Sequence, residues 1–134
     1  MIGVCILPGW MAFCGIDSEG RENPKKLHIY KNIYSQADIF SHPGITVCYF
    51  GEDEIYFSPR CFYDNVQDIP SFRLGERLWT GYTCTSLSYP YTMLENHSED
   101  GVLQIMILME NSSEKISLED PDVRMILQSI TIHK

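Results

Sequence analysis

The C-terminal stretch, residues 101–134, reads GVLQIMILMENSSEKISLEDPDVRMILQSITIHK. Residues 102–109 form an almost unbroken apolar run, preceded by Asp100-Gly101 and followed by the polar residues 110–113. An apolar run of this length, rich in branched side chains and bounded by turn-forming residues, is typical of a strand buried on both faces. The sequence therefore predicts a central strand over residues 102–109.

An amphipathic helix is predicted after this strand, over residues 121–130. Its apolar side chains recur at positions i, i+3, i+4 and i+7 and form one stripe. The stripe consists of Val123, Ile126, Leu127 and Ile130. Ser117 and Asp120 resemble a capping box, and Pro121 suits the first helical position. A strand followed by such a helix predicts a sheet with a helix packed across one face.

The rest of the chain has mainly the pattern of β-strands. We expect these strands at residues 2–7, 27–32, 45–50, 72–74, 78–85 and 89–94. Residues 15–26 are polar and contain Gly15, Gly20 and Pro24, so they predict an exposed loop. The run from residue 72 to residue 109 has the pattern of an antiparallel meander.

A short helix is predicted in the middle of the chain. Ser58 and Pro59 have the pattern of a helix cap followed by a proline at the first helical position. Phe62, Tyr63 and Val66 would form the apolar face of this helix, and Pro70 would end it. The expected fold is α+β: a mostly antiparallel sheet of about six to seven strands, with the C-terminal amphipathic helix and the short middle helix packed on it.

Length and charge limit the class of protein. At 134 residues we expect one domain, residues 1–134. The net charge of −8 argues against direct binding to nucleic acid, which needs a basic surface. No apolar run reaches the roughly 18–20 residues of a membrane-spanning helix. No signal peptide is visible, so we expect a cytoplasmic protein, or an envelope protein if a signal was removed.

No pattern of catalytic, metal-binding or cofactor-binding residues is present. The five cysteines form an odd set without the spacing of a disulfide framework or a zinc site. Reduced thiols are expected. The four histidines are scattered, so we expect neither a metal nor a cofactor. Cys61 is the one candidate nucleophile, at the third position of the predicted middle helix, where helix amides lower a thiol pKa. Packing beside Phe62 is the alternative role.

Two groups of residues are candidates for binding a partner. Tyr89 and Tyr91 lie on a predicted strand, and tyrosine is over-represented both at binding surfaces and in strand pairs. Trp79 is expected in the core. Acidic residues cluster in turns, above all Glu52, Asp53 and Glu54. Such clusters serve either solubility or the steering of a basic partner.

Two pieces of the chain together resemble the PsbP-like and DcrB-like domains. The segment Ile6-Leu7-Pro8-Gly9-Trp10 resembles their opening strand, and residues 126–132 resemble their closing helix. The strands at residues 81–82, 91–94 and 102–109 follow in the order of that family's meander. The resemblance implies an α/β sandwich of the kind attached to exported lipoproteins in Gram-positive bacteria, and a non-enzymatic role.

The first functional hypothesis is a non-enzymatic module that binds another protein with a basic surface. A small acidic protein suits an inhibitor or immunity-type role against a toxin or a nucleic-acid-binding effector such as a CRISPR nuclease. The second is an exported lipoprotein-type domain that binds a ligand or serves as an accessory. The third is a thiol-dependent enzyme that uses Cys61. The sequence names neither the partner nor the oligomeric state.

Overall fold

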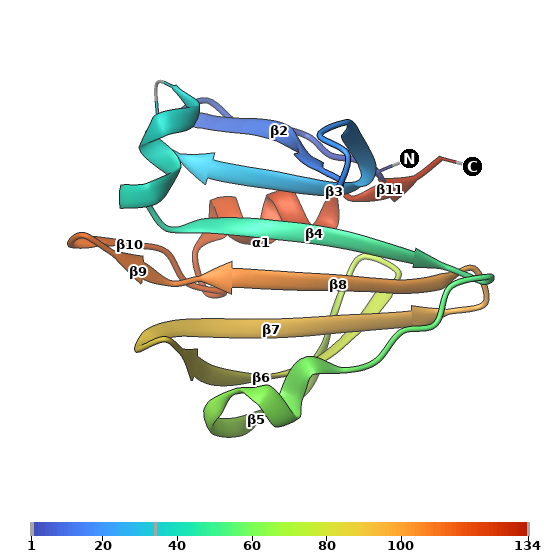
Figure 1. Ribbon diagram of the computed structural model, residues 1–134. Coiled ribbons are helices and arrows are strands. Elements are labelled where there is room, and N and C mark those ends of the chain that lie inside the picture. Colours follow the sequence, from blue (N-terminus) through green and yellow to red (C-terminus); the bar gives the residue numbers. More distant parts are fainter. Residues whose placement is uncertain (1, 34, 134) are drawn as a thin grey trace.

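The strand β8 (Gly101–Leu108) is the middle one of seven strands in an antiparallel sheet, with the order β2-β3-β4-β8-β7-β6-β5. The computed structural model describes residues 2–33 and 35–133, except for the side chains of residues 36 and 37. The other six strands are β2 (Trp10–Ile16), β3 (Glu22–Lys31), β4 (Gly44–Gly51), β5 (Asp64–Leu74), β6 (Arg77–Ser86) and β7 (Tyr89–Ser98). The expected α+β fold with a mainly antiparallel sheet is confirmed (Figure 1).

Short elements complete the chain. They are β1 (Ile2–Gly3), η1 (Gln36–Ser41), η2 (Pro59–Phe62), β9 (Glu110–Asn111), β10 (Glu114–Lys115), α1 (Pro121–Gln128) and β11 (Thr131–Ile132). β1 pairs with β11, so the two ends of the described chain lie side by side. The strands from β5 to β8 are successive neighbours, as the meander prediction requires. No helix of the described residues is both long and apolar enough to cross a membrane.

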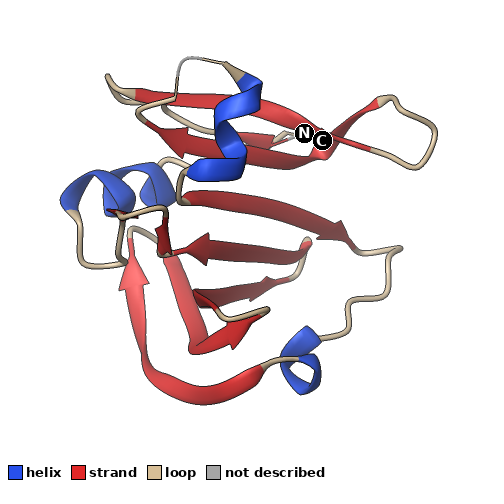
Figure 2. Cartoon of the chain, turned by 60° about the vertical axis from the view of Figure 1, so that its left-hand side comes forward, coloured by secondary structure: helices blue, strands red, loops and turns tan. Residues whose placement is uncertain are grey.

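The helix α1 covers one face of the sheet (Figures 1 and 2). Its stripe is buried: Val123 and Leu127 have no exposed surface and Ile126 is 1% exposed. The strands present their most buried side chains to it: Ile29, Ile45, Val47, Trp79, Leu94, Ile105 and Ile107. The predicted stripe and the predicted core position of Trp79 are thus confirmed.

Polar contacts fix the N-terminus of α1. Pro121 occupies the first turn, as predicted, and the N-cap position is Asp120, whose side chain makes no hydrogen bond to the helix. The Asp120 carboxylate accepts hydrogen bonds from the backbone amide and the hydroxyl of Ser117, at 2.9 and 3.1 Å. Asp122 accepts a hydrogen bond from the Trp10 indole at 3.1 Å and forms an ion pair with Lys31 at 3.2 Å. Partial burial alone would raise the pKa of Asp122, but these two donors outweigh it and lower that pKa.

In the described residues, the opposite face of the sheet carries no α-helix, and only the short 3-10 helices η1 and η2 lie over parts of it (Figure 1). Here Tyr82, Cys84 and Met93 are buried, while Tyr91 and Met106 are half-buried beside them. The prediction that residues 102–109 are buried on both faces is therefore wrong in part: on this face Gln104 is buried, but Val102, Met106 and Leu108 are only half-buried. We call this surface the open face.

The predicted middle helix is also wrong in extent. Residues 59–62 form a single 3-10 turn, η2, with no buried residue, and residues 64–74 are a strand. In β5 the half-buried side chains Val66, Ile69 and Phe72 recur every three residues, which mimics a helix. Two shifts in the β5–β6 register, between residues 64 and 67 and between residues 69 and 72, produce this spacing. Pro70 is tolerated because β5 is an edge strand.

The N-terminal strands also differ from the prediction. Only residues 2–3 of the predicted first strand are paired, and the first long strand is β2, which follows the turn at Pro8-Gly9. Gly9 has a φ of +87°, which favours glycine. β3 begins at Glu22, inside the predicted loop. The sequence missed this part because residues 22–25 lie beyond the β3–β4 pairing, which ends at Lys26 and Cys48, and they carry no buried apolar stripe.

We expect the Ile126→Ala variant to lose roughly 2–5 kcal/mol of unfolding free energy, because truncation leaves a cavity between α1 and the sheet. Met125→Ala is the matched control, since Met125 lies on the same helix and is 58% exposed. Chemical denaturation measures both. Equal losses in the two variants would mean that the stripe is not what holds the helix.

We expect Ellman titration of the unfolded, non-reduced protein to count five thiols, because all five cysteines are unpaired in the structure. In the native protein the exposed Cys5 and Cys61 should react first. Cys48 and Cys84 should react slowly, since burial blocks access and raises the pKa of both thiols. A count of one or three, or fast labelling of Cys84, would contradict this assignment.

Candidate functional site

The two main acidic turns meet at one end of the sheet. β4 and β8 pair along their full length, so Gly51 at the end of β4 lies opposite Gly101. Gly101 in turn closes the β7–β8 turn against Ser98. A hydrogen bond of 2.6 Å from the Tyr49 hydroxyl to the carbonyl of Asp100 joins the two turns (right-hand side of Figure 1). Residues 52–54 and residues 99–100, far apart in sequence, are therefore neighbours.

We call residues 52–57 the acidic loop. Its Glu54 accepts hydrogen bonds from the Gly51 amide, at 3.1 Å, and from the Lys25 ammonium group. The Lys25 contact, followed by the Gly51 contact, lowers the pKa of Glu54. Glu52 and Asp53 are exposed, and within the described part of the chain no lysine or arginine forms an ion pair with either. Their charges are available to a partner.

Tyr56 attaches the acidic loop to the open face of the sheet. Its hydroxyl donates a hydrogen bond of 2.7 Å to Glu95 of β7, and the amide of Gln104 contacts the same hydroxyl at 3.4 Å. The ring packs on Phe50 at 4.9 Å and on the edge of His97 at 6.0 Å. Burial, followed by the bond to Glu95, raises the pKa of Tyr56, so its hydroxyl remains a donor.

This anchoring places two apolar side chains in solvent. Ile55 is 77% exposed and Phe57 is 80% exposed, on either side of the half-buried Tyr56. Exposed apolar side chains that lie close together mark interaction surfaces, whereas single ones occur on any protein surface. The sequence analysis missed both residues. The signal that marks them is an apolar-aromatic-apolar triplet, residues 55–57, directly after three acidic residues in a segment without strand alternation.

A shallow hollow of about 410 Å³ lies between the acidic loop and the β7–β8 turn. Its lining includes Phe50, Glu52, Glu54, Tyr56, His97 and Glu99. The His97 imidazole contacts the Glu95 carboxylate at 2.8 Å, a pairing that occurs in general bases. The neighbouring hydroxyl, that of Ser98, instead donates to the carbonyl of Gly101. In the described residues this hollow therefore brings no nucleophile onto His97.

The other sequence candidates lie elsewhere. Tyr91 is half-buried against Cys84 and Met93 on the open face, and burial raises its pKa. Tyr89, at the start of β7, is 45% exposed. With about 3.3 Å per residue along β7, Tyr91 and Tyr89 lie roughly 13 and 20 Å from Glu95, the residue that Tyr56 of the acidic loop contacts.

For the third hypothesis, none of the described histidines lies on the element that carries Cys61. Cys61 is exposed in η2, which is a single turn of 3-10 helix rather than the predicted α-helix. The histidines lie on or beside other elements, with His28 on β3 and His97 on β7. Among the described residues no group of three or more His, Cys, Asp or Glu side chains is placed to hold a metal ion.

We expect Tyr56→Phe to lower the free energy of unfolding by roughly 1–3 kcal/mol, because Glu95 loses a donor in a place where its side chain is only 17% exposed. Tyr89→Phe is the control, since that tyrosine is largely exposed, and should change the free energy by less than about 0.5 kcal/mol. Urea denaturation measures the free energy of unfolding of both variants. An equally small loss in the two would show that the Tyr56 hydroxyl does not fix the loop.

Comparison of the chain with protein-family models, with curated proteins and with solved structures found no match.

Proposed function

We propose that this protein is a non-enzymatic interaction module, and that its acidic loop docks on a basic surface of another protein. The observation that carries the proposal is the composition of the loop surface: the unpaired carboxylates of Glu52 and Asp53 lie beside the exposed side chains of Ile55 and Phe57. Charge at the rim and apolar anchors at the centre are the usual parts of a protein interface.

The charge around the loop supports a basic partner. Six of the 18 acidic residues gather at this end of the sheet: Glu52, Asp53, Glu54, Glu95, Glu99 and Asp100. Lys25 pairs with one of them. A cluster of one sign raises the rate at which an oppositely charged surface is encountered. An inhibitor or immunity-type protein, which must reach its target quickly, would use such a surface.

The anchoring also favours binding over catalysis. Tyr56 holds the loop through contacts to β4, β7 and β8, so the apolar side chains on either side of it are presented from a fixed backbone. A pre-ordered loop loses less conformational entropy on association than a free one. The carboxylates would then set mainly the association rate, and the apolar side chains would set mainly the dissociation rate.

The first experiment separates those roles kinetically, with the partner captured from the source organism. Glu52→Lys with Asp53→Lys should slow association and leave dissociation nearly unchanged, because long-range attraction acts before contact. The control, Glu22→Lys with Glu114→Lys, makes the same change in net charge at other exposed positions. Association should also slow as salt rises from about 50 to 500 mM, which shortens the Debye length from about 14 to about 4 Å.

The second arm tests the apolar contacts. Phe57→Ser should speed dissociation by about tenfold or more, as expected for a buried aromatic anchor. Leu87→Ser, a change at a 90% exposed leucine in the β6–β7 turn, should leave both rates unchanged. An association rate that ignores salt and the charge reversal, with a dissociation rate that ignores Phe57→Ser, would show that the acidic loop is not the interface.

A further inference from the structure

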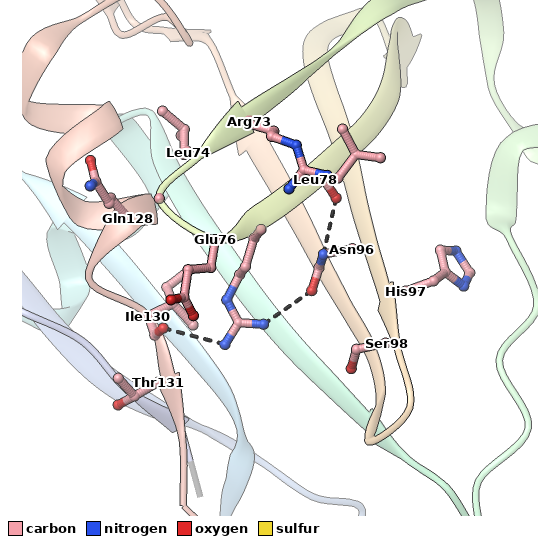
Figure 3. Close-up of a pocket in the computed structure, with 12 residues that line it drawn as sticks. Arg73, Leu74, Glu76, Leu78, Asn96, His97, Ser98, Gln128, Ile130 and Thr131 are labelled. Atoms are coloured by element: carbon pink, nitrogen blue, oxygen red, sulfur yellow. Dashed lines mark hydrogen bonds between the residues drawn. The ribbon is translucent and has the colours of Figure 1, made fainter.

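A cavity of about 660 Å³ lies where β6 and β7 diverge, next to the β5–β6 hairpin turn and the segment that follows α1 (Figure 3). The β6–β7 pairing ends at Thr80 and Glu95. Beyond that point the Asn96 side chain joins the strands, because its amide nitrogen donates to the carbonyl of Leu78 at 3.0 Å. The cavity is therefore a built feature of the sheet, and its volume is in the range of small-molecule pockets.

Two arginines, Arg73 and Arg77, are among the residues that line the cavity. Arg77 is half-buried and held in place: it donates to the side-chain oxygen of Asn96 at 3.0 Å and to the carbonyl of Ile130 at 3.5 Å. These two bonds are the dashed lines that reach the labelled Asn96 and Ile130 in Figure 3. Asn96 itself is 6% exposed, so the group that orients Arg77 is fixed in the interior.

Neither guanidinium has an acidic partner. Glu76 also lines the cavity, yet no carboxylate of the described residues forms an ion pair with Arg73 or Arg77. Six of the other basic residues do have one: Arg21, Lys25, Lys31, Arg60, Lys115 and Arg124. In a chain with a net charge of −8, the two arginines left unpaired share one cavity.

The geometry points to a binding site for a small molecule that carries an oxyanion, either a phosphate or a carboxylate. A guanidinium offers planar pairs of N–H donors that fit both groups, and both hydrogen bonds of Arg77 go to neutral oxygens. The rest of the lining suits the body of such a molecule, because Leu74, Leu78 and Ile130 are apolar while Gln128 and Thr131 offer hydrogen bonds.

The experiment titrates the intact protein with inorganic phosphate, phenyl phosphate and benzoate, at constant ionic strength made up with chloride. Binding is measured by calorimetry and by the melting temperature, which a ligand of the native state raises. We expect saturable binding of phenyl phosphate, of benzoate or of both, tighter than that of inorganic phosphate because a larger part of the cavity is filled. Preference for one of the two identifies the natural group as phosphate or carboxylate.

Variants assign the binding to the arginines. Arg73→Gln should weaken binding about tenfold, since it removes one charged donor from an exposed residue that the fold does not need. Arg77→Lys keeps the charge but loses the planar pair of donors, and should weaken binding by a similar factor. Arg60→Gln, with the same loss of charge outside the cavity, should bind like the wild type. If Arg77→Lys fails to fold, Arg73→Gln alone decides.

Two results would overturn the inference. One is that no probe binds or raises the melting temperature above the chloride reference. The other is that Arg60→Gln weakens binding as much as Arg73→Gln, which would mean that the anions respond to overall charge and not to this cavity.

Discussion

Burial of one face of the sheet under α1 is the constraint on which the other features depend. Leu94, Ile105 and Ile107, on the two central strands β7 and β8, have no exposed surface on this side. Burying a side chain of this size is worth roughly 1.5–3 kcal/mol, so these strands fix which face turns inward. An eight-residue helix is too short to cover all seven strands. Apolar side chains from the two chain ends and from the segment before α1 therefore cover the rest of this face: Ile2, Val4, Leu7, Ile116, Leu118 and Ile132.

This arrangement leaves the open face without a second layer, and loops partly replace one. The edge strand β5 is bent by two bulges, and its Val66 packs with Tyr63 on Tyr82 and Met93. Further along, Tyr56 brings the acidic loop onto the same face. The exposed side chains at residues 55 and 57 follow from this use of a short loop, because only the residue between them reaches the sheet.

The two proposed sites are neighbours with opposite charge. The acidic hollow and the arginine cavity both include His97 and Ser98, at the end of β7, in their linings. They are kept apart by Glu95 and Asn96, which follow each other on β7 and therefore point to opposite faces of the sheet. Glu95 contacts Tyr56 on the open face, whereas Asn96 contacts Arg77 on the helix side. One strand end thus separates a surface suited to a basic protein from a cavity suited to an anion.

The sequence by itself determined the α+β class, the central strand, the meander and the start and apolar stripe of α1. Those features follow from local patterns, namely a continuous apolar run, a helical period and a proline at the first helical turn. It misassigned residues 64–74, since bulges give an edge strand a spacing of three that a helix also has. It found the charges of residues 52–54 but not their neighbours. Only the tertiary structure shows that the acidic loop lies beside the β7–β8 turn, that Phe57 is exposed, and that Arg73 and Arg77 line one cavity. These three features depend on strand register and on contacts between residues distant in sequence.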